Sequence, residues 1–259
     1  MVKKPIKHLG QHFLTDENTI SAIIQTISPA PGQNICEIGP GLGAITRPVL
    51  RNSGAMHAIE IDRELTGELL EQCSQAGTLT LHQADVLKFD FNCVATTAHP
   101  VRLIGNLPYN ISTPLLFHLL QFSRMIVDMH FMLQKEVVDR ITAMPGTSEY
   151  SRLSVSVQSR CRVESLFDIM PSMFSPPPKV ISSFMRLLPE SSSSDKIHNH
   201  MLFNKLVKTA FQQRRKTIKN SLTRMATETE LQQAGIDPGK RPQDISVQQY
   251  INLANLLSG

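Results

Sequence analysis

The residues best suited to chemistry stand together at Asn106-Leu107-Pro108-Tyr109, directly after a strand-like run at 101–105. An amino group on an aromatic ring is a poor nucleophile, because its lone pair is delocalised into the ring. The Asn106 side-chain oxygen and the Leu107 carbonyl can accept both amino hydrogens and bias the nitrogen towards tetrahedral geometry. Pro108 stiffens the turn, and Tyr109 offers a face on which a base can stack. This pattern predicts methylation of the exocyclic amino group of adenine; the alternative is a plain turn before a helix.

A glycine-rich loop, Gly39-Pro40-Gly41-Leu42-Gly43, follows the short apolar run at 34–38 and opens a helical pattern. Glycines let the backbone approach a ligand closely, and a helix N-terminus offers free N–H groups. The spacing is GxGxG and differs from the GxGxxG of dinucleotide sites. Alone, such a loop is equally consistent with a structural turn.

Two acids stand at the ends of the next two strand-like runs, at Glu60 and Asp85. Glu60 lies 21 positions after Gly39, the spacing at which a carboxylate accepts hydrogen bonds from ribose hydroxyls. Asp85 is placed to receive the amino hydrogens of an adenine ring. Each acid alone could be a helix N-cap, but the pair beside a glycine loop indicates an adenosine cradle. The loop has no lysine that could bind phosphate, as a P-loop would, so we expect an adenosine without phosphate. The predicted cofactor is therefore S-adenosyl-L-methionine.

Positive charge is concentrated in the last quarter of the chain, although the whole protein has a net charge of only +4. No acid interrupts a run of cations before Glu228: Lys196, Lys205, Lys208, Arg214, Arg215, Lys216, Lys219 and Arg224. A second basic cluster stands at the N-terminus: Lys3, Lys4 and Lys7. Solvated helix faces usually mix charge signs. One sign over such a length predicts a polyanionic partner, most simply nucleic acid.

The elements that must position these residues alternate between strand and helix patterns over the first ~185 residues, which predicts an α/β fold with a Rossmann-like parallel sheet. Strands are expected at 34–38, 56–61, 79–82, 101–105 and 129–133, with further strands at 154–158 and 184–188. Helices are expected at 20–27, 44–52, 115–120 and 136–143, the second kinked at Pro48.

Proline and serine mark the later boundaries. Three prolines make 174–179 an extended loop, and the polar segment 189–195 is the best linker. Beyond it the apolar spacing is helical, as at 202–210, 218–225 and 250–257. We therefore predict a methyltransferase domain over 1–189 and a small helical RNA-binding domain over 196–259.

Several classes of protein are disfavoured. No apolar window has the ~18 residues of a membrane span, and the basic N-terminus is not followed by the apolar core of a signal peptide. The cysteines (Cys36, Cys73, Cys93, Cys161) and the pair His198 and His200 lack metal-ligand spacing. We expect a cytoplasmic protein without a bound metal.

These motifs together resemble the ribosomal RNA adenine dimethyltransferases, and in particular their bacterial small-subunit members, which are linked to kasugamycin sensitivity. The resemblance covers nearly the whole chain. It rests on Gln11-His12-Phe13-Leu14, Glu37 to Gly43, Glu60, Asp85, Asn106 to Asn110, Phe174 to Ser182, Phe211 to Thr217 and Arg241 to Ser246.

The resemblance implies an enzyme that dimethylates the N6 amino groups of two adjacent adenines in the 3′-terminal hairpin of 16S rRNA within the small ribosomal subunit, with a role in subunit biogenesis. It implies cofactor contacts from His12, Leu14, Gly39, Glu60, Asp85 and Asn106. Asn106, Leu107, Pro108 and Tyr109 would hold the target base, with Phe174 as a second stacking partner. Arg214, Arg215 and Lys216 would grip phosphates. The family usually has asparagine where this chain has His12, which can still donate a hydrogen bond. We expect a monomer.

Three other interpretations share part of this pattern. A 23S rRNA adenine N6-methyltransferase of the macrolide-resistance type has the same cradle, but Arg214-Arg215-Lys216 and the C-terminal ending favour the small-subunit enzyme. A DNA adenine methyltransferase is disfavoured, because we see no additional target-recognition domain. An assembly factor whose binding role outweighs catalysis is compatible with every motif.

Overall fold

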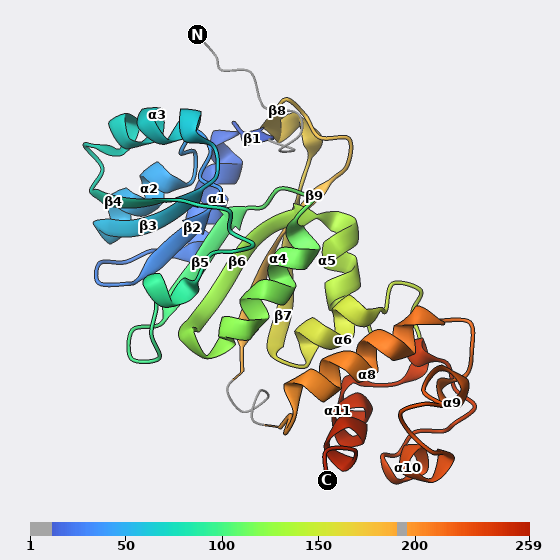
Figure 1. Cartoon of the computed structure of the whole chain (residues 1–259). Helices are drawn as coiled ribbons and strands as arrows, with labels where there is room; N and C mark the ends of the chain where they lie inside the picture. Colours follow the sequence, from blue (N-terminus) through green and yellow to red (C-terminus); the bar gives the residue numbers. More distant parts are fainter. Residues whose placement is uncertain (1–11, 191–195) are drawn as a thin grey trace. The chain divides into compact units, whose positions relative to one another are not determined.

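Seven strands within the first 190 residues form one sheet in the computed structural model of the chain (Figure 1). Its strand order is β4 (Thr78–Gln83), β3 (Ala55–Glu60), β2 (Ile35–Ile38), β5 (Val101–Asn106), β6 (Ile126–Gln134), β9 (Ser182–Pro189) and β7 (Cys161–Ile169). The first five strands are parallel neighbours, whereas β9 runs antiparallel to β6. The predicted α/β class with a Rossmann-like parallel sheet is confirmed, with β9 as an antiparallel addition.

The structure describes residues 12–190 and 196–259. The basic cluster predicted at Lys3, Lys4 and Lys7, and the Gln11 of the family motif, lie outside the described residues.

The strand order reverses between β2 and β5. From β2 the chain builds outwards through β3 to β4, and it then returns to the other side of β2 with β5 and β6. In open parallel sheets, the crevice at the carboxyl ends of the two strands flanking such a reversal is where ligands bind. Pairing of Glu37 with Ile104 places the loop after Ile38 beside Asn106. The topology therefore brings the glycine loop and the Asn106 motif together.

Helices cover both faces of this sheet, and all four residues of its interior strand β2 are therefore buried. On one face α1 (Glu17–Ile27), α2 (Thr46–Ser53) and α3 (Arg63–Cys73) contribute Ile23, Val49 and Leu69 to a core with strand residues such as Ile104. The remaining helices of this part are α4 (Ser112–Leu119), α5 (Lys135–Thr142) and the 3₁₀ turns at Phe91–Cys93, Leu120–Met125 and Pro171–Met173. A two-stranded ribbon of β1 (Phe13–Leu14) and β8 (Phe174–Ser175) joins the N-terminal segment to the proline loop.

Two local predictions require correction. The expected strand at 154–158 is helix α6 (Arg152–Gln158). Its alternating Ser and Val residues imitate a strand, but Ser151 and Ser154 form a capping box that starts a helix. The second correction concerns the kink expected at Pro48. Helix α2 begins at Thr46, so Pro48 lies in its first turn, where a backbone N–H has no intrahelical partner and a proline costs no helical hydrogen bond. The sequence analysis also missed α3 and β7.

The chain divides into two compact units. The N-terminal unit comprises the described residues up to Val138 together with Glu164–Pro189, and the C-terminal unit comprises Asp139–Val163 together with the described residues from Glu190 to Gly259. The C-terminal unit is helical, with α6, α8 (His200–Gln212), α9 (Ile218–Ser221), α10 (Glu228–Gln233) and α11 (Val247–Leu256), and a 3₁₀ turn at Pro242–Asp244. Its own core includes Tyr150 and Val155, from the segment that precedes the predicted boundary at residue 189. Among the helices of the described residues, none has the length and hydropathy needed to cross a membrane.

Candidate active site

A cavity of about 280 Å³ opens at the carboxyl ends of β2, β3 and β5 and beside the loop after β4, within the N-terminal unit. Nine of the predicted site residues line it: His12, Leu14, Gly39, Glu60, Asp85, Asn106, Leu107, Pro108 and Tyr109. They come from five separate stretches of the chain. The topological reversal between β2 and β5 is what gathers them into one site.

The glycine loop needs glycine at two positions that face this cavity. Gly39 and Gly41 have φ angles of 70° and 55°, in the left-handed region that side chains disfavour. A Cβ on Gly41 would also lie 3.1 Å from the Phe13 ring, which packs on the loop from β1. The Gly41 N–H donates to Glu60 Oε2 at 3.3 Å. The loop is therefore held from both sides, while its bare backbone remains open to a ligand.

Glu60 is fixed by the backbone that follows it. Its Oε1 accepts hydrogen bonds from the N–H groups of Ile61 and Asp62, both at 2.9 Å. Burial raises the pKa of Glu60, and the three backbone N–H groups that bond to it work in the opposite direction. A carboxylate has about four acceptor positions, so Glu60 keeps capacity for a further donor such as a ribose hydroxyl.

Asp85 offers a second acceptor on the other side of the cavity. Its Oδ1 accepts from the Leu87 N–H at 3.0 Å, whereas its Oδ2 has no hydrogen-bond donor among the described residues. The polar groups of the cavity, two carboxylates that accept hydrogen bonds and a bare glycine loop, fit a nucleoside without phosphate. Within residues 12–190 and 196–259, no group of three or more His, Cys, Asp and Glu side chains is placed to hold a metal ion.

Glu37 is a cavity residue to which the sequence analysis gave no role. Its side chain is buried under α2, and its Oε2 accepts a hydrogen bond from Thr46 Oγ1 at 2.6 Å. Burial raises the pKa of Glu37 to about 7, and the nearby Glu60 carboxylate adds to this effect, while the Thr46 bond opposes it. The contact to Thr46 spans nine residues and crosses from a strand to a helix, so residue type alone could not reveal it.

The raised pKa of Glu37 has a consequence for stability. The folded protein holds this proton more tightly than the unfolded chain, in which glutamate titrates near pH ~4.3. Glu37 therefore lowers the free energy of unfolding as pH rises from ~4.3 to about 7, and its effect is constant above that. Glu37→Gln removes this titration. We expect the variant to gain stability relative to the parent between pH 5 and pH 8, by at most about 3 kcal/mol.

Urea unfolding at the two pH values measures this difference. Because Glu60 is present in both proteins, its own titration largely cancels from the comparison. A stability difference that does not change with pH would contradict the assignment of the titration to Glu37.

Asn106 is oriented by the N-terminal segment. Its Nδ2 donates to the His12 backbone carbonyl at 2.8 Å. Because a carbonyl only accepts, this contact must use the amide nitrogen, and no described residue donates to the Asn106 side-chain oxygen. The next residues show the same division. The Leu107 N–H donates to Met132 O at 3.1 Å, but its carbonyl oxygen has no donor among the described residues, whereas the Pro108 carbonyl accepts from Ile111 N and Ser112 Oγ. Two adjacent acceptors at the cavity thus have no donor within residues 12–190 and 196–259.

Tyr109 is held at its hydroxyl and at its ring. The hydroxyl shares a hydrogen bond of 2.7 Å with Ser182 Oγ. The His12 imidazole stacks on the ring, with centroids 5.7 Å apart and planes inclined by 29°. Burial raises the pKa of Tyr109, so the ring is a neutral stacking surface at neutral pH. Ser182 stands 73 residues further along the chain, at the end of the Phe174 to Ser182 motif, but no sequence signal indicated its contact with Tyr109.

Phe174 does not take the place expected of it. It does not line the cavity, and its side chain lies in the core, 4% exposed. Strand β8 pairs with β1 so that Phe174 stands opposite Leu14, which is also buried in that core. The ring that stacks on Tyr109 is that of His12, and the prediction for Phe174 is corrected.

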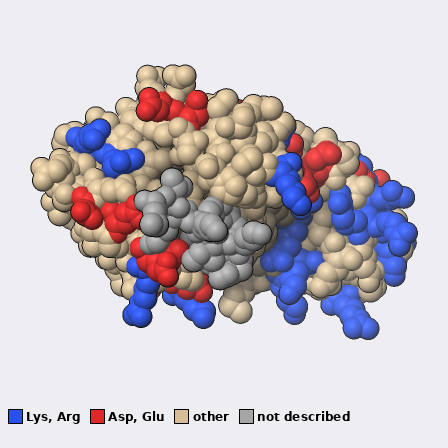
Figure 2. All heavy atoms as spheres, turned by 90° about the horizontal axis from the view of Figure 1, so that it is seen from above, with Lys and Arg blue, Asp and Glu red and all other residues tan. Residues whose placement is uncertain are grey.

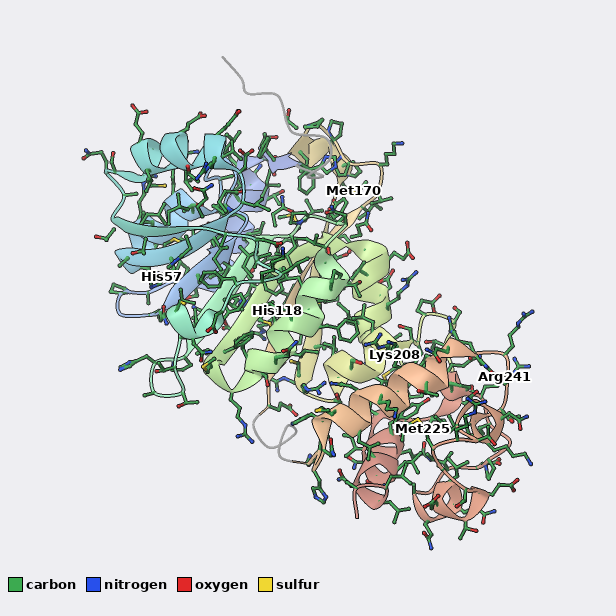
Figure 3. The ribbon with its side chains drawn as sticks, viewed as in Figure 1. His57, His118, Met170, Lys208, Met225 and Arg241 are labelled. Atoms are coloured by element: carbon green, nitrogen blue, oxygen red, sulfur yellow. The ribbon has the colours of Figure 1, made fainter. Side chains whose placement is uncertain are left out.

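The predicted phosphate contacts belong to the C-terminal unit, which carries 14 Lys and Arg against 8 Asp and Glu. Figure 2 shows Lys and Arg side chains gathered on this unit, and Lys208 and Arg241 are labelled on it in Figure 3. Arg215 and Lys216 are exposed, and their side chains have no partner among the described residues. Arg214 differs, because its Nη2 donates to the carbonyls of Ser148 and Tyr150 at 2.9 and 3.1 Å.

Comparison with known proteins identifies the family of the chain. The family model described as "Ribosomal RNA adenine dimethylase" matches residues 2–258. A relative from Acinetobacter baylyi, named ribosomal RNA small subunit methyltransferase A, is 46% identical over 97% of this chain and 92% of its own length. Relatives of the same name from Aromatoleum aromaticum and Vibrio vulnificus are 48% and 44% identical, over 97% and 99% of this chain and 94% and 96% of their own lengths.

Two solved structures share the architecture. A dimethyladenosine transferase from Plasmodium falciparum has a TM-score of 0.79 at 25% identity, over 93% of this chain and 96% of that one. The 23S rRNA methyltransferase ErmE has a TM-score of 0.70 at 24% identity, over 95% of this chain and 100% of that one, and shows the fold alone. The chain therefore belongs to the ribosomal RNA adenine dimethylase family, and it is an S-adenosyl-L-methionine-dependent methyltransferase of ribosomal RNA adenine.

Proposed function

We propose that this enzyme dimethylates the N6 amino groups of two adjacent adenines in the 3′-terminal hairpin of 16S rRNA, within the small ribosomal subunit. The observation that carries the proposal is a pair of acceptors, Asn106 Oδ1 and the Leu107 carbonyl, at the edge of a nucleoside-sized cavity; neither accepts a hydrogen bond from a described residue. The small-subunit substrate is supported by relatives of that name at 44–48% identity over nearly their full length.

The residues divide into a cofactor group and a base group. Glu60 and Asp85 would accept hydrogen bonds from the nucleoside of S-adenosyl-L-methionine, with the loop from Gly39 against it and with His12, Leu14 and Asn106 at the edge. When bound, this cofactor supplies a methyl group already activated on a sulfonium. Asn106 and Leu107 would accept the two hydrogens of the adenine amino group, and Tyr109 would stack on the base. Since the methyl group is already activated, alignment supplies most of the acceleration.

The target adenine must leave its stack to reach the cavity, which costs a few kcal/mol, and less for a loop base. Basic residues of the C-terminal unit would hold the phosphates and position the RNA without reading its sequence. A role in subunit biogenesis, a monomeric state and a cytoplasmic location, where small subunits are available, belong to the same proposal.

The decisive experiment incubates unmethylated small subunits with labelled S-adenosyl-L-methionine and maps the modified nucleotides. We expect dimethyladenine at two neighbouring positions of the 3′-terminal hairpin, with large subunits and DNA unlabelled. Label in large subunits would favour the 23S type of enzyme. No label in adenine of either particle would overturn the proposal.

A separate prediction tests the phosphate contacts. Replacing both Arg215 and Lys216 by alanine is expected to weaken RNA binding similarly for all sequences, and to reduce the slope of log affinity against log salt by about 1 to 2. Binding of RNA or small subunits over a salt series measures this. Arg214→Ala is the informative comparison, because its guanidinium is bonded within the unit and its loss should lower stability. An unchanged salt slope in the double variant would exclude these two residues from the interface.

A further inference from the structure

His12 makes three separate contacts around the base-binding motif. Its backbone carbonyl accepts from Asn106 Nδ2, and its imidazole stacks on Tyr109 at 5.7 Å. Its Nδ1 lies 2.8 Å from the Pro176 carbonyl oxygen, in the loop after β8. Because a carbonyl only accepts, Nδ1 carries the proton and donates it. One residue therefore joins the N-terminal segment, the methylation motif and the proline loop. Strand β1 of the N-terminal segment and strand β8, which leads into the proline loop, lie side by side in Figure 1.

These contacts determine the setting of the Tyr109 ring. Its hydroxyl is tied to Ser182, and the imidazole covers part of one face. Because the imidazole Nδ1 donates a hydrogen bond to the Pro176 carbonyl oxygen, the imidazole cannot turn away from Tyr109 without losing that bond. Tyr109 also lines the cavity, so a base that enters it can stack on the part of the ring that the imidazole does not cover. The plane of the target adenine is then set by a ring that is supported at two points.

The support of the Tyr109 ring by His12 matters more for the second methyl transfer than for the first. An unmodified adenine amino group has two hydrogens, one for Asn106 Oδ1 and one for the Leu107 carbonyl. After one methylation the nitrogen keeps a single hydrogen, so only one of the two acceptors can be used. The monomethylated base therefore depends more on stacking for its alignment, and a misplacement of about 1 Å can cost about 100-fold in rate.

We propose that His12 is a positioning residue that acts through Tyr109 and favours the second methyl transfer over release of the monomethylated product. This inference rests on the proposed dimethylation of adenine, and it goes beyond a cofactor contact at this position.

Three variants separate the contacts of the side chain. His12→Ala removes both the stack and the bond to Pro176. His12→Asn keeps a donor for Pro176 but has no ring, and His12→Phe keeps a ring but no donor. His99→Ala is the matched control, because His99 is an exposed histidine outside the cavity lining. The products on unmethylated small subunits are digested, and the ratio of monomethylated to dimethylated adenosine is measured at saturating S-adenosyl-L-methionine.

A second readout needs neither cofactor nor RNA. The chain has three tyrosines, and both others, Tyr150 and Tyr250, are fully buried in the C-terminal unit. Incorporation of 3-fluorotyrosine therefore gives three fluorine NMR signals, and Tyr109→Phe identifies the one from Tyr109. Loss of the His12 ring should shift that signal and leave the other two in place.

We expect His12→Ala and His12→Asn to raise the ratio of monomethylated to dimethylated product by about 2- to 10-fold, the range of one aromatic stack, and to shift the Tyr109 signal. His12→Phe keeps a ring but loses the bond that holds it, so it should raise the ratio less than His12→Ala does, whereas His99→Ala should match the parent in both readouts. A parent-like ratio in His12→Ala, with only weaker cofactor binding, would overturn the inference, as would an unshifted Tyr109 signal. If the parent enzyme itself leaves adenine unmethylated, it is the proposed function that fails.

Discussion

Asn106→Ala is expected to lower methyl transfer by about 100- to 1000-fold, the range seen when one fixed polar group that stabilises a transition state is removed. The variant loses the acceptor for one amino hydrogen and also the bond from Nδ2 to the His12 carbonyl, which orients the motif. Stability should fall by only about 0.5–1.5 kcal/mol, the net worth of one hydrogen bond. Single-turnover transfer of labelled methyl groups to unmethylated small subunits measures the rate, and thermal unfolding measures the stability.

The control for this variant is Asn52→Ala, which removes an exposed amide from α2 that bonds only to Pro48 O. It should methylate at the parent rate. Asn106→Ala activity within a few-fold of the parent would remove Asn106 from the catalytic role. The same variant examines the assembly interpretation. If it still binds small subunits and they accumulate with the protein attached, binding carries a role of its own, whereas a purely catalytic protein should leave only unmethylated rRNA.

Gly105→Ala is expected to destabilise the protein by about 3 kcal/mol or more and to abolish cofactor binding. A Cβ at this position would lie 2.4 Å from the Ile38 backbone oxygen. Overpacking usually costs about 1–3 kcal/mol when side chains can give way. Here the obstacle is the backbone of β2, so relief must separate β2 from β5 where the glycine loop and Asn106 meet.

Gly67→Ala is the matched control for this substitution. Gly67 lies within α3, and nothing would stand within 4 Å of an added Cβ. Alanine is favoured over glycine inside a helix by about 0.5–1 kcal/mol, so this variant should be slightly more stable than the parent. Urea unfolding and titration with S-adenosyl-L-methionine measure both changes. Gly105→Ala with parent stability and cofactor affinity would mean that β2 and β5 can separate freely.

Much of the site was predictable because its parts are local. Glu60 and Asn106 end their strands, and Gly39 and Asp85 come shortly after theirs. Parallel strands end at the same edge of a sheet. Their side-chain types then limit what they can bind. The C-terminal helices were equally visible from apolar spacing, because a helix that buries one face needs residues three and four apart.

Other elements could not be predicted, for identifiable reasons. The Ser-Val-Ser-Val run in α6 has the period of a strand, but Ser151 caps it as a helix, and Gln158 bonds to the carbonyls of Ile141 and Ala143. The place of β9 between β6 and β7 depends on pairing across the sheet, of which the β9 residues alone give no sign. Local propensity is a weak guide where tertiary contacts decide.

The amino-acid sequence by itself determined the chemistry of the opening motif, Asn106-Leu107-Pro108-Tyr109, and of the acids and cations around it, because those properties belong to side chains and to short spacings. Only the tertiary structure decided which of their atoms are used. It turned the Asn106 nitrogen to His12 and left the oxygen without a donor from the part of the chain that the structure describes. It buried Phe174, and it placed His12 and Ser182 against Tyr109. These contacts join residues up to 97 positions apart. These contacts depend on which strands and loops lie beside one another in the fold, and the sequence of a strand does not by itself indicate which strand it pairs with.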